Sequence, residues 1–335
     1  MSNAGGFTYR VAQGWEQIPE GFTHKDVVGV GVDSKDRVYL LTRSDPRVMV
    51  YERDGTFVAS WAEGLFTNRT HGIRIGPDDS VFCVDDGDHT VRKFSPTGEL
   101  LLTLGTKGVA SDSGYDKNLA NSDLWDRLVS IKRGSAPFNR PTNISVAPDG
   151  ELYVCDGYGN ARVHRFTADG KVIQSWGEPG TGPGEFYLPH DVWVLEDGRV
   201  LVADRENDRI QIFNRDGKYL SEWTHLQRPT GIFIRDRRIY VSELSRRKGM
   251  KSFRLGEAKE TLPGRVSILD LDGKLVHQWG GQDMAAAGNF YSPHTVCADS
   301  RGDLYVGEVV YTDWISKGLA PEGSHSFQKF EKVAG

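Results

Sequence analysis

The sequence lacks the features that would place the chain in a membrane or carry it across one. No apolar run approaches the ~18 residues that a membrane-spanning helix needs. The amino-terminal stretch MSNAGGFTYRVAQGW has neither the basic region nor the apolar region of a signal peptide. Only three cysteines occur, Cys83, Cys155 and Cys297, and an odd number in no close motif argues against a disulfide framework. We therefore expect a cytoplasmic protein; a periplasmic location stays open if a signal peptide was removed.

An excess of positive charge is also missing. The chain has 41 Lys and Arg against 46 Asp and Glu, and its formal net charge is -5. This balance supplies no general attraction to nucleic acid or to an anionic membrane. The basic stretches RDRR (235–238) and SRRK (245–248) are short. We expect a small-molecule substrate as the partner, with no nucleic acid and no membrane; the oligomeric state is not indicated.

Six repeats of one pattern run along the chain. Each repeat has an alternating apolar segment, an Asp/Gly turn, a (V/L)YV-x-D segment, a basic alternating segment, a second such turn and a segment that often ends in Trp. The six repeats begin at Val27, Thr70, Arg140, Leu188, Pro229 and Pro293. Four short period-two segments per repeat predict four antiparallel strands. The sequence therefore predicts an all-β fold, a six-bladed β-propeller with four strands per blade. The blade pattern resembles the NHL-repeat propellers.

We expect one domain over residues 1–335, interrupted by three insertions. The insertions cover about 106–139, 244–264 and 310–325. A short helix is expected around Asn121–Lys132. The amino-terminal FTYRVAQGW is expected to complete a terminal blade, and SFQKFEK (326–332) to supply an outer strand of the last one. Long loops in a compact repeat fold are usually functional or disordered, so the insertions could form a lid or simply be solvated.

Histidine recurs at one position of the repeat, at the start of the first strand. Around the six repeats this frame position holds Val28, His71, Thr142, His190, Thr230 and His294. A single histidine at a strand start is more often a packing or surface residue, but three of nine in strict alternation are not easily explained that way. Alternate blades of six lie roughly 120° apart, so three such side chains would converge on one point. This arrangement predicts a metal site, with zinc as first choice and iron, copper, nickel or manganese as alternatives.

Three further residues are expected beside the histidines. Antiparallel pairing brings positions 14 to 16 residues after the frame position back to the same end of the blade. Arg43, Arg205 and Tyr158 stand there and break the residue type of the repeat. Arginine can bind a carboxylate with two hydrogen bonds, and a tyrosine near a cation can act as a base. The alternative is that all three only hydrogen-bond across the mouth of the propeller. Acids at the fourteenth position are expected to bond backbone amides; they are Asp85, Asp156, Asp204 and Glu308.

The sequence resembles the peptidyl-α-hydroxyglycine α-amidating lyases. The resemblance rests on LPH (188–190), SPH (292–294), CDGYGNAR (155–162) and VADRENDRIQ (202–211), and it covers nearly the whole chain. It implies that His71, His190 and His294 bind a catalytic zinc ion. It further implies that Tyr158 is the base and that Arg43 and Arg205 are active-site arginines. Together with the three histidines, these are the six residues already selected from the repeat. The implied reaction cleaves the C–N bond of an α-hydroxyglycine carbinolamide to an amide and glyoxylate or another aldehyde.

Departures from the family pattern keep the function open. Gly159 stands where the family's animal enzymes have a cysteine after the tyrosine, and Thr295 replaces an aspartate that binds structural calcium, so calcium is not expected. No copper monooxygenase segment accompanies the repeats. A metal-dependent hydrolase of a small ester, lactone or amide on the same histidines is the first alternative. A non-catalytic NHL binding module is the second.

Overall fold

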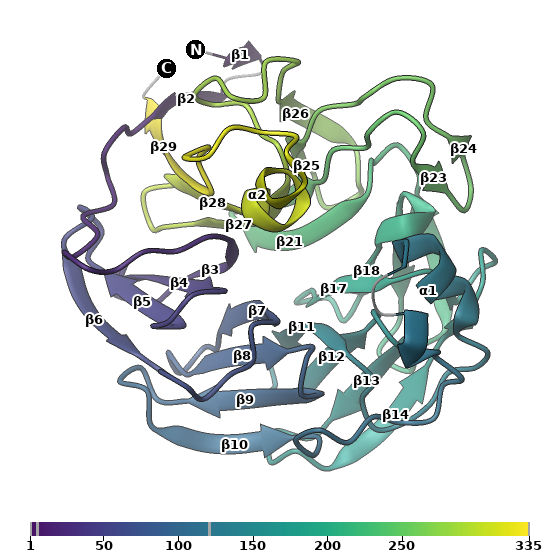
Figure 1. Ribbon diagram of the computed structural model, residues 1–335. Helices are drawn as coiled ribbons and strands as arrows, with labels where there is room; N and C mark the ends of the chain where they lie inside the picture. Colours follow the sequence, from purple (N-terminus) through teal and green to yellow (C-terminus); the bar gives the residue numbers. More distant parts are fainter. Residues whose placement is uncertain (1, 5–6, 120–121, 334–335) are drawn as a thin grey trace. The chain divides into compact units, whose positions relative to one another are not determined.

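The computed structural model of the chain describes residues 2–4, 7–119 and 122–333. The main strands form six sheets in which neighbouring strands lie side by side and antiparallel (Figure 1). The expected all-β, six-bladed β-propeller with four strands per blade is confirmed. Two additional two-stranded pairs lie in loops, β15 (Glu178–Pro179) with β16 (Glu185–Phe186), and β23 (Lys251–Ser252) with β24 (Gly256–Glu257).

The strands of the six sheets follow the six repeats. The first sheet has β3 (Val27–Val32), β4 (Val38–Thr42), β5 (Val48–Tyr51) and β6 (Phe57–Trp61), and the second has β7 (Thr70–Ile75), β8 (Val81–Asp85), β9 (Thr90–Phe94) and β10 (Leu100–Leu104). The third has β11 (Pro141–Val146), β12 (Leu152–Asp156), β13 (Arg162–Phe166) and β14 (Val172–Trp176), and the fourth has β17 (Pro189–Val194), β18 (Val200–Asp204), β19 (Arg209–Phe213) and β20 (Tyr219–Trp223). The fifth has β21 (Pro229–Arg235), β22 (Arg238–Glu243), β25 (Arg265–Leu269) and β26 (Leu275–Trp279).

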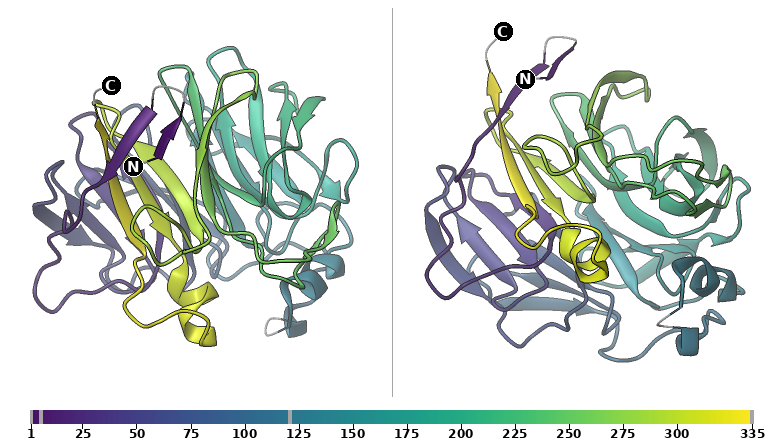
Figure 2. Two further views of the ribbon diagram at one scale, coloured as in Figure 1. Left: turned by 90° about the horizontal axis from the view of Figure 1, so that it is seen from above. Right: turned by 45° about the horizontal axis from the view of Figure 1, so that its top comes forward.

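The sixth sheet contains both ends of the chain. Its order is β27 (Pro293–Ala298), β28 (Leu304–Glu308), β29 (Phe327–Val333), β2 (Phe7–Val11) and β1 (Ser2–Ala4). The purple amino-terminal strand lies alongside the yellow carboxyl-terminal strand in both views of Figure 2. The amino-terminal segment therefore completes a blade as expected. The segment 326–332 is the third strand of this sheet and not the outer one, because β2 occupies the next position.

The chain divides into two compact units. Unit 2 comprises Arg69–Pro229 and Gly249–Lys259 and contains the second, third and fourth sheets. Unit 1 comprises Met1–Asn68, Thr230–Lys248 and Glu260–Gly335 and contains the other three sheets, apart from Pro229. The single domain expected from the sequence stays a prediction.

Burial in unit 2 falls from the first strands of each sheet to the last. All five residues of β8, β12 and β18 are buried, whereas β10, β14 and β20 are mostly exposed or half-buried. Apolar residues of adjacent sheets pack together: Val84 lies in one core cluster with Ile144, and Val163 lies in another with Val192. Each such side chain contributes about 1.5–3 kcal/mol when fully buried. These cores fix the first strands, at whose beginnings the frame residues lie.

The Asp/Gly turns of the repeat explain how the strands reverse. Gly150 in the turn PDG has φ +88°, a left-handed conformation that favours glycine. Its N–H donates to the carbonyl of Ala147, whose own N–H donates to Glu151. The turn EDG at Gly198 has the same conformation, with φ +86°. The repeated turn sequence therefore sets the pairing of the first two strands.

Apart from η2 (Arg205–Asn207), the helical segments of the described residues lie in the first and third insertions. These are η1 (Lys117–Leu119) and α1 (Leu124–Ser130) in the first insertion, and α2 (Val310–Asp313) and η3 (Ile315–Lys317) in the third; η2 follows β18. The helix expected over 121–132 is confirmed as α1, although Asn121 itself lies outside the described residues. The Asp123 carboxylate begins α1 by accepting from the N–H of Trp125 at 2.9 Å. Among the residues described, no helix has the length and apolar character to cross a membrane.

The first and second insertions meet within unit 2 through three stacked aromatic rings. Trp125 of α1 stacks on Phe253 with ring centroids 3.8 Å apart and planes 8° apart. Phe253 also stacks on Tyr187, at 3.6 Å and 14°. Tyr187 lies three residues before His190, and its N–H donates to Asp204 at 2.9 Å. The stack therefore ties both insertions to the segment that leads into β17.

Candidate functional site

Two of the predicted histidines lie together in unit 2. His71 is the second residue of β7 and His190 is the second residue of β17. Their ring centroids are 4.7 Å apart, and each side chain is buried. The repeat frame thus places both imidazoles at the same point of their first strands. His294 occupies the same position of β27 in unit 1 and is also buried.

Backbone carbonyls orient two of the imidazoles. His71 Nδ1 lies 2.7 Å from the carbonyl oxygen of Thr142, and His294 Nδ1 lies 2.7 Å from that of Val28. A carbonyl oxygen only accepts hydrogen bonds, so Nδ1 carries the proton in both rings. In the neutral rings Nε2 then presents its lone pair. Metal-binding histidines in proteins are commonly held in this way.

The frame positions that hold threonine have a related role. The Thr142 hydroxyl lies 2.9 Å from the carbonyl oxygen of Pro189, the residue before His190. The Thr230 hydroxyl lies 3.0 Å from the carbonyl oxygen of Pro293, the residue before His294. A threonine in one blade thus bonds the strand that carries the next histidine. The alternation of histidine and threonine thus gives three imidazoles. The two threonine hydroxyls hold the strands that carry His190 and His294.

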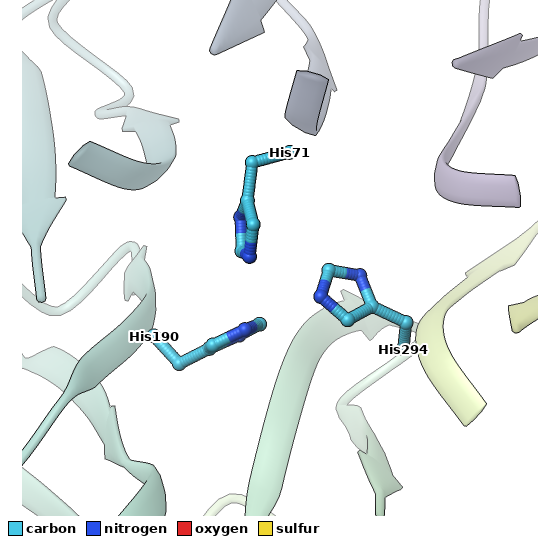
Figure 3. A group of neighbouring side chains, drawn as sticks. All are labelled: His71, His190 and His294. Carbon is cyan, nitrogen blue, oxygen red and sulfur yellow. The ribbon is translucent and has the colours of Figure 1, made fainter. Parts of the chain in front are cut away.

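The three histidines offer nitrogen atoms that all lie within 4.8 Å of one another (Figure 3). In a tetrahedral site, Zn–N bonds of about 2.0–2.1 Å place two ligand nitrogens about 3.3–3.4 Å apart, so the widest pair would have to close by up to about 1.5 Å. Imidazole nitrogens are ligands that suit zinc and other first-row transition metals. The three imidazoles are therefore a donor set that suits one divalent transition-metal ion.

Tyr158 lies between a histidine and an arginine in unit 2. Its phenolic oxygen is 3.2 Å from His71 Nε2 and accepts a hydrogen bond from Arg205 Nη1 at 3.0 Å. Because His71 Nε2 is the acceptor nitrogen, the phenol donates its own hydrogen to that ring. The structure therefore brings Tyr158, Arg205, His71 and His190 together, as the spacing within the repeat had suggested.

Arg205 stays charged despite its burial. Burial alone would lower its pKa, but the Tyr158 oxygen and the Glu206 carboxylate outweigh that effect and raise the pKa above its usual value. Arg205 Nε donates to Glu206 at 2.8 Å. Glu206 also accepts from Arg228 Nη2 at 2.8 Å, which gives an Arg–Glu–Arg triple. A fixed positive charge therefore lies next to the phenolic oxygen.

A second group of two arginines and one carboxylate lies beside Tyr158. Arg69 donates twice to Asp86, at 2.5 and 2.9 Å, and Arg140 Nη2 donates to Asp86 at 3.2 Å. The Arg69 guanidinium lies over the Tyr158 ring, 5.8 Å from its centroid. Burial would raise the pKa of Asp86, but Arg69 and Arg140 outweigh it and lower the pKa to about 2. Asp86 is therefore a carboxylate at all ordinary pH values.

Sequence reasoning missed these two triples, although the repeat contains a signal for them. Arg69, Arg140 and Arg228 each stand two residues before the frame position of their repeat. They occupy the second, third and fifth blades. This basic position is neither the histidine position nor one of the positions 14 to 16 residues later, on which the predicted site depends.

Arg43 lies in unit 1, directly after β4. Its Nη1 lies 3.3 Å from the Asp26 carboxylate and 3.0 Å from the Thr312 hydroxyl. Thr312 belongs to α2 in the third insertion. Arg43 therefore joins its blade to that insertion, and its role toward a substrate stays a prediction.

Comparisons with known proteins agree with this architecture. A family model described as a 6-bladed beta-propeller matches residues 133–226. NHL repeat-containing protein 3 of Homo sapiens is 35% identical over 230 residues, which cover 65% of this chain and 60% of that protein. Peptidyl-alpha-hydroxyglycine alpha-amidating lyase 1 of Drosophila melanogaster is 28% identical over 173 residues, or 49% of this chain and 28% of that protein. The chain is therefore similar to NHL repeat-containing proteins and to amidating lyases.

A solved structure of similar fold matches nearly the whole chain. The structure titled as a streptogramin B lyase has a TM-score of 0.58 and 12% identity, and covers 99% of this chain and 100% of that one. At that identity the likeness concerns the fold alone. The chain spans about 60% of the length of the human NHL repeat-containing protein.

The acids at the fourteenth position of the repeat have the predicted structural role. Asp156 accepts from the N–H of Asn139 at 2.8 Å and Asp204 from that of Tyr187 at 2.9 Å. Glu308 accepts from the N–H of Tyr291, also at 2.9 Å. Each donor lies three residues before the frame position of its blade. These acids thus hold the segment that leads to the site.

Proposed function

We propose that this protein is a metal-dependent lyase that cleaves the C–N bond of an α-hydroxyglycine-like carbinolamide to an amide and glyoxylate or a related aldehyde. The observation that carries the proposal is the position of the Tyr158 oxygen, between Arg205 Nη1 and His71 Nε2. The similarity to a protein named as an amidating lyase supports it. The activity of the whole protein, its substrate and its partners are part of the proposal.

His71, His190 and His294 would hold the metal through their Nε2 atoms, with zinc as first choice. Two of these rings donate Nδ1–H to a backbone carbonyl, which leaves Nε2 as the ligand atom. A bound divalent ion supplies Lewis-acid polarisation of the substrate's hydroxyl oxygen. The protein's own side chains carry out the remaining steps.

Tyr158 would move the proton. In its deprotonated form the phenolic oxygen takes the proton of the substrate's carbinol O–H, and the electron pair of that bond forms the new C=O bond. The C–N bond breaks, its electrons pass to the amide nitrogen, and the proton is delivered there. Arg205, whose Nη1 lies 3.0 Å from the phenolic oxygen, stabilises negative charge on that atom between the two transfers. Arg205 and Arg43 would bind the substrate carboxylate next to the reacting carbon with their guanidinium groups.

The direct test supplies zinc-loaded full-length protein with N-benzoyl-α-hydroxyglycine. We expect benzamide and glyoxylate in equal amounts, formed faster than in buffer that contains the same zinc concentration. No rate above that buffer would contradict the proposal.

Other products would identify the alternatives. Benzoate, or turnover of an ester or lactone that depends on the same three histidines, would indicate a hydrolase. A chain that retains no metal and turns over none of these substrates would indicate a non-catalytic NHL binding module.

A further inference from the structure

Two guanidinium groups lie close to the ring of Tyr158. The Arg205 guanidinium carbon lies 5.4 Å from the ring centroid and that of Arg69 lies 5.8 Å from it. Both distances are in the range of cation–π contacts. Arg205 belongs to the set predicted from the repeat, whereas Arg69 does not. The proposed base therefore has a second cation beside it that the mechanism above does not use.

Each of these cations belongs to a group of two arginines and one carboxylate. Arg205 and Arg228 share Glu206, and Arg69 and Arg140 share Asp86. Each group thus contains two guanidinium groups and one carboxylate. The pairing with Asp86 and Glu206 fixes the guanidinium planes, because Arg69 binds its carboxylate with two hydrogen bonds. Two oriented positive groups thus lie on one tyrosine in a chain whose net charge is -5.

The two cations differ in their access to solvent. The Arg205 side chain is 4% exposed, whereas the Arg69 side chain is 36% exposed. A group that approaches Tyr158 from solvent therefore reaches Arg69 while a deeper group reaches Arg205. Guanidinium groups bind carboxylates with directional, charge-assisted hydrogen bonds. The geometry fits two anionic groups on one ligand, one deep and one near the surface.

We propose that the substrate carries two carboxylate groups, and that Arg69 is a specificity-determining residue for the second one. Arg205 binds the carboxylate next to the reacting carbon of the substrate. Arg69 binds a second carboxylate, on the acyl side of the substrate. This inference rests on the proposed function, because it takes the reacting group to lie at Tyr158. The substrate class is an N-acyl-α-hydroxyglycine whose acyl chain ends in a carboxylate, as a succinyl group does.

The test uses two inert ligands that differ at one end. N-succinylglycine and N-butyrylglycine lack the reacting hydroxyl and differ only by a carboxylate in place of a methyl group. Their dissociation constants are measured by titration calorimetry on zinc-loaded full-length protein, with the wild type, Arg69→Gln and Arg162→Gln. Arg162 is a matched control, since it lies in β13 of the same unit and pairs with Glu178 at 3.0 Å.

We expect the wild type and Arg162→Gln to bind N-succinylglycine about tenfold or more tightly than N-butyrylglycine. Arg69→Gln should remove this preference and leave the affinity for N-butyrylglycine unchanged. Arg69→Lys, which keeps the charge beside Asp86, should retain part of the preference and covers the case in which Arg69→Gln does not fold.

Equal affinities in the wild type, or no binding of either ligand, would overturn the proposal. An equal loss for both ligands in Arg69→Gln would also overturn it, because it would indicate a structural role. Neither ligand can react, so these results are independent of whether glyoxylate is released from N-benzoyl-α-hydroxyglycine.

Discussion

Replacing Tyr158 by phenylalanine removes one oxygen atom and leaves the ring in place. That oxygen accepts from Arg205 at 3.0 Å and lies 3.2 Å from His71. A positioned general base contributes about 10²–10⁴-fold to a rate, so we expect kcat to fall by that factor, which corresponds to about 3–5 kcal/mol of barrier. The variant should remain folded, because Arg205 keeps its bond to Glu206 and the loss of one hydrogen bond costs about 1–3 kcal/mol.

The assay is glyoxylate release from N-benzoyl-α-hydroxyglycine under saturating substrate, with the metal content measured on the same samples. Tyr153→Phe is a matched control, because the Tyr153 hydroxyl also accepts from an arginine, Arg215, but lies near the opposite end of β12 from Asp156. We expect kcat of this control within a factor of about two of the wild type. If Tyr158→Phe retains wild-type kcat and metal content, Tyr158 is not the base and the reasoning is refuted.

Three further predictions concern the surroundings of the site. Phe253→Ala removes two aromatic stacks worth about 0.5–1.5 kcal/mol each, so hydrogen exchange should rise in residues 122–133 and 249–259 with little change elsewhere; unchanged exchange there would contradict the stack. Thr142→Val removes the hydroxyl bond to the Pro189 carbonyl and should lower the free energy of unfolding in urea by about 1–2 kcal/mol, whereas Thr142→Ser should retain most of it. The carboxyl of Asp86 has its pKa lowered to about 2, below an unfolded value of about 3.9, so it stabilises the fold above pH 4 and loses this effect as the pH falls toward 2. The difference in unfolding free energy between the wild type and Asp86→Asn should therefore narrow by about 2 kcal/mol on full protonation, and a constant difference would refute the assignment.

The repeat made the inner part of each blade predictable. Alternation of apolar residues and the Asp/Gly turns gave the strands, and antiparallel pairing then placed Tyr158 and Arg205 at the end where His71 and His190 begin their strands. These predictions depend on contacts within one hairpin or on one repeated position. Such contacts follow from sequence spacing, because the period of a strand and the geometry of its turn are local properties.

Other parts of the site depend on contacts between segments that the repeat does not relate. Asp86 binds Arg140 across 54 residues, and Trp125 meets Phe253 across two insertions that have no period. The position of β29 was wrong by one strand, because the sequence does not say which end of the chain takes the outer place in a shared blade. Side-chain pairing between blades and closure of a sheet by two chain ends depend on tertiary contacts. Local sequence patterns are compatible with several such arrangements.

The central claim is that one metal ion binds at the three frame histidines. Elemental analysis of protein purified with added zinc tests it most directly, on the wild type, His71→Ala and His225→Ala, an exposed histidine outside the frame. We expect about one ion per chain in the wild type and in His225→Ala, and a large loss in His71→Ala, since three imidazoles are needed for tight binding. Equal metal content in all three proteins, whether full or absent, would contradict the account.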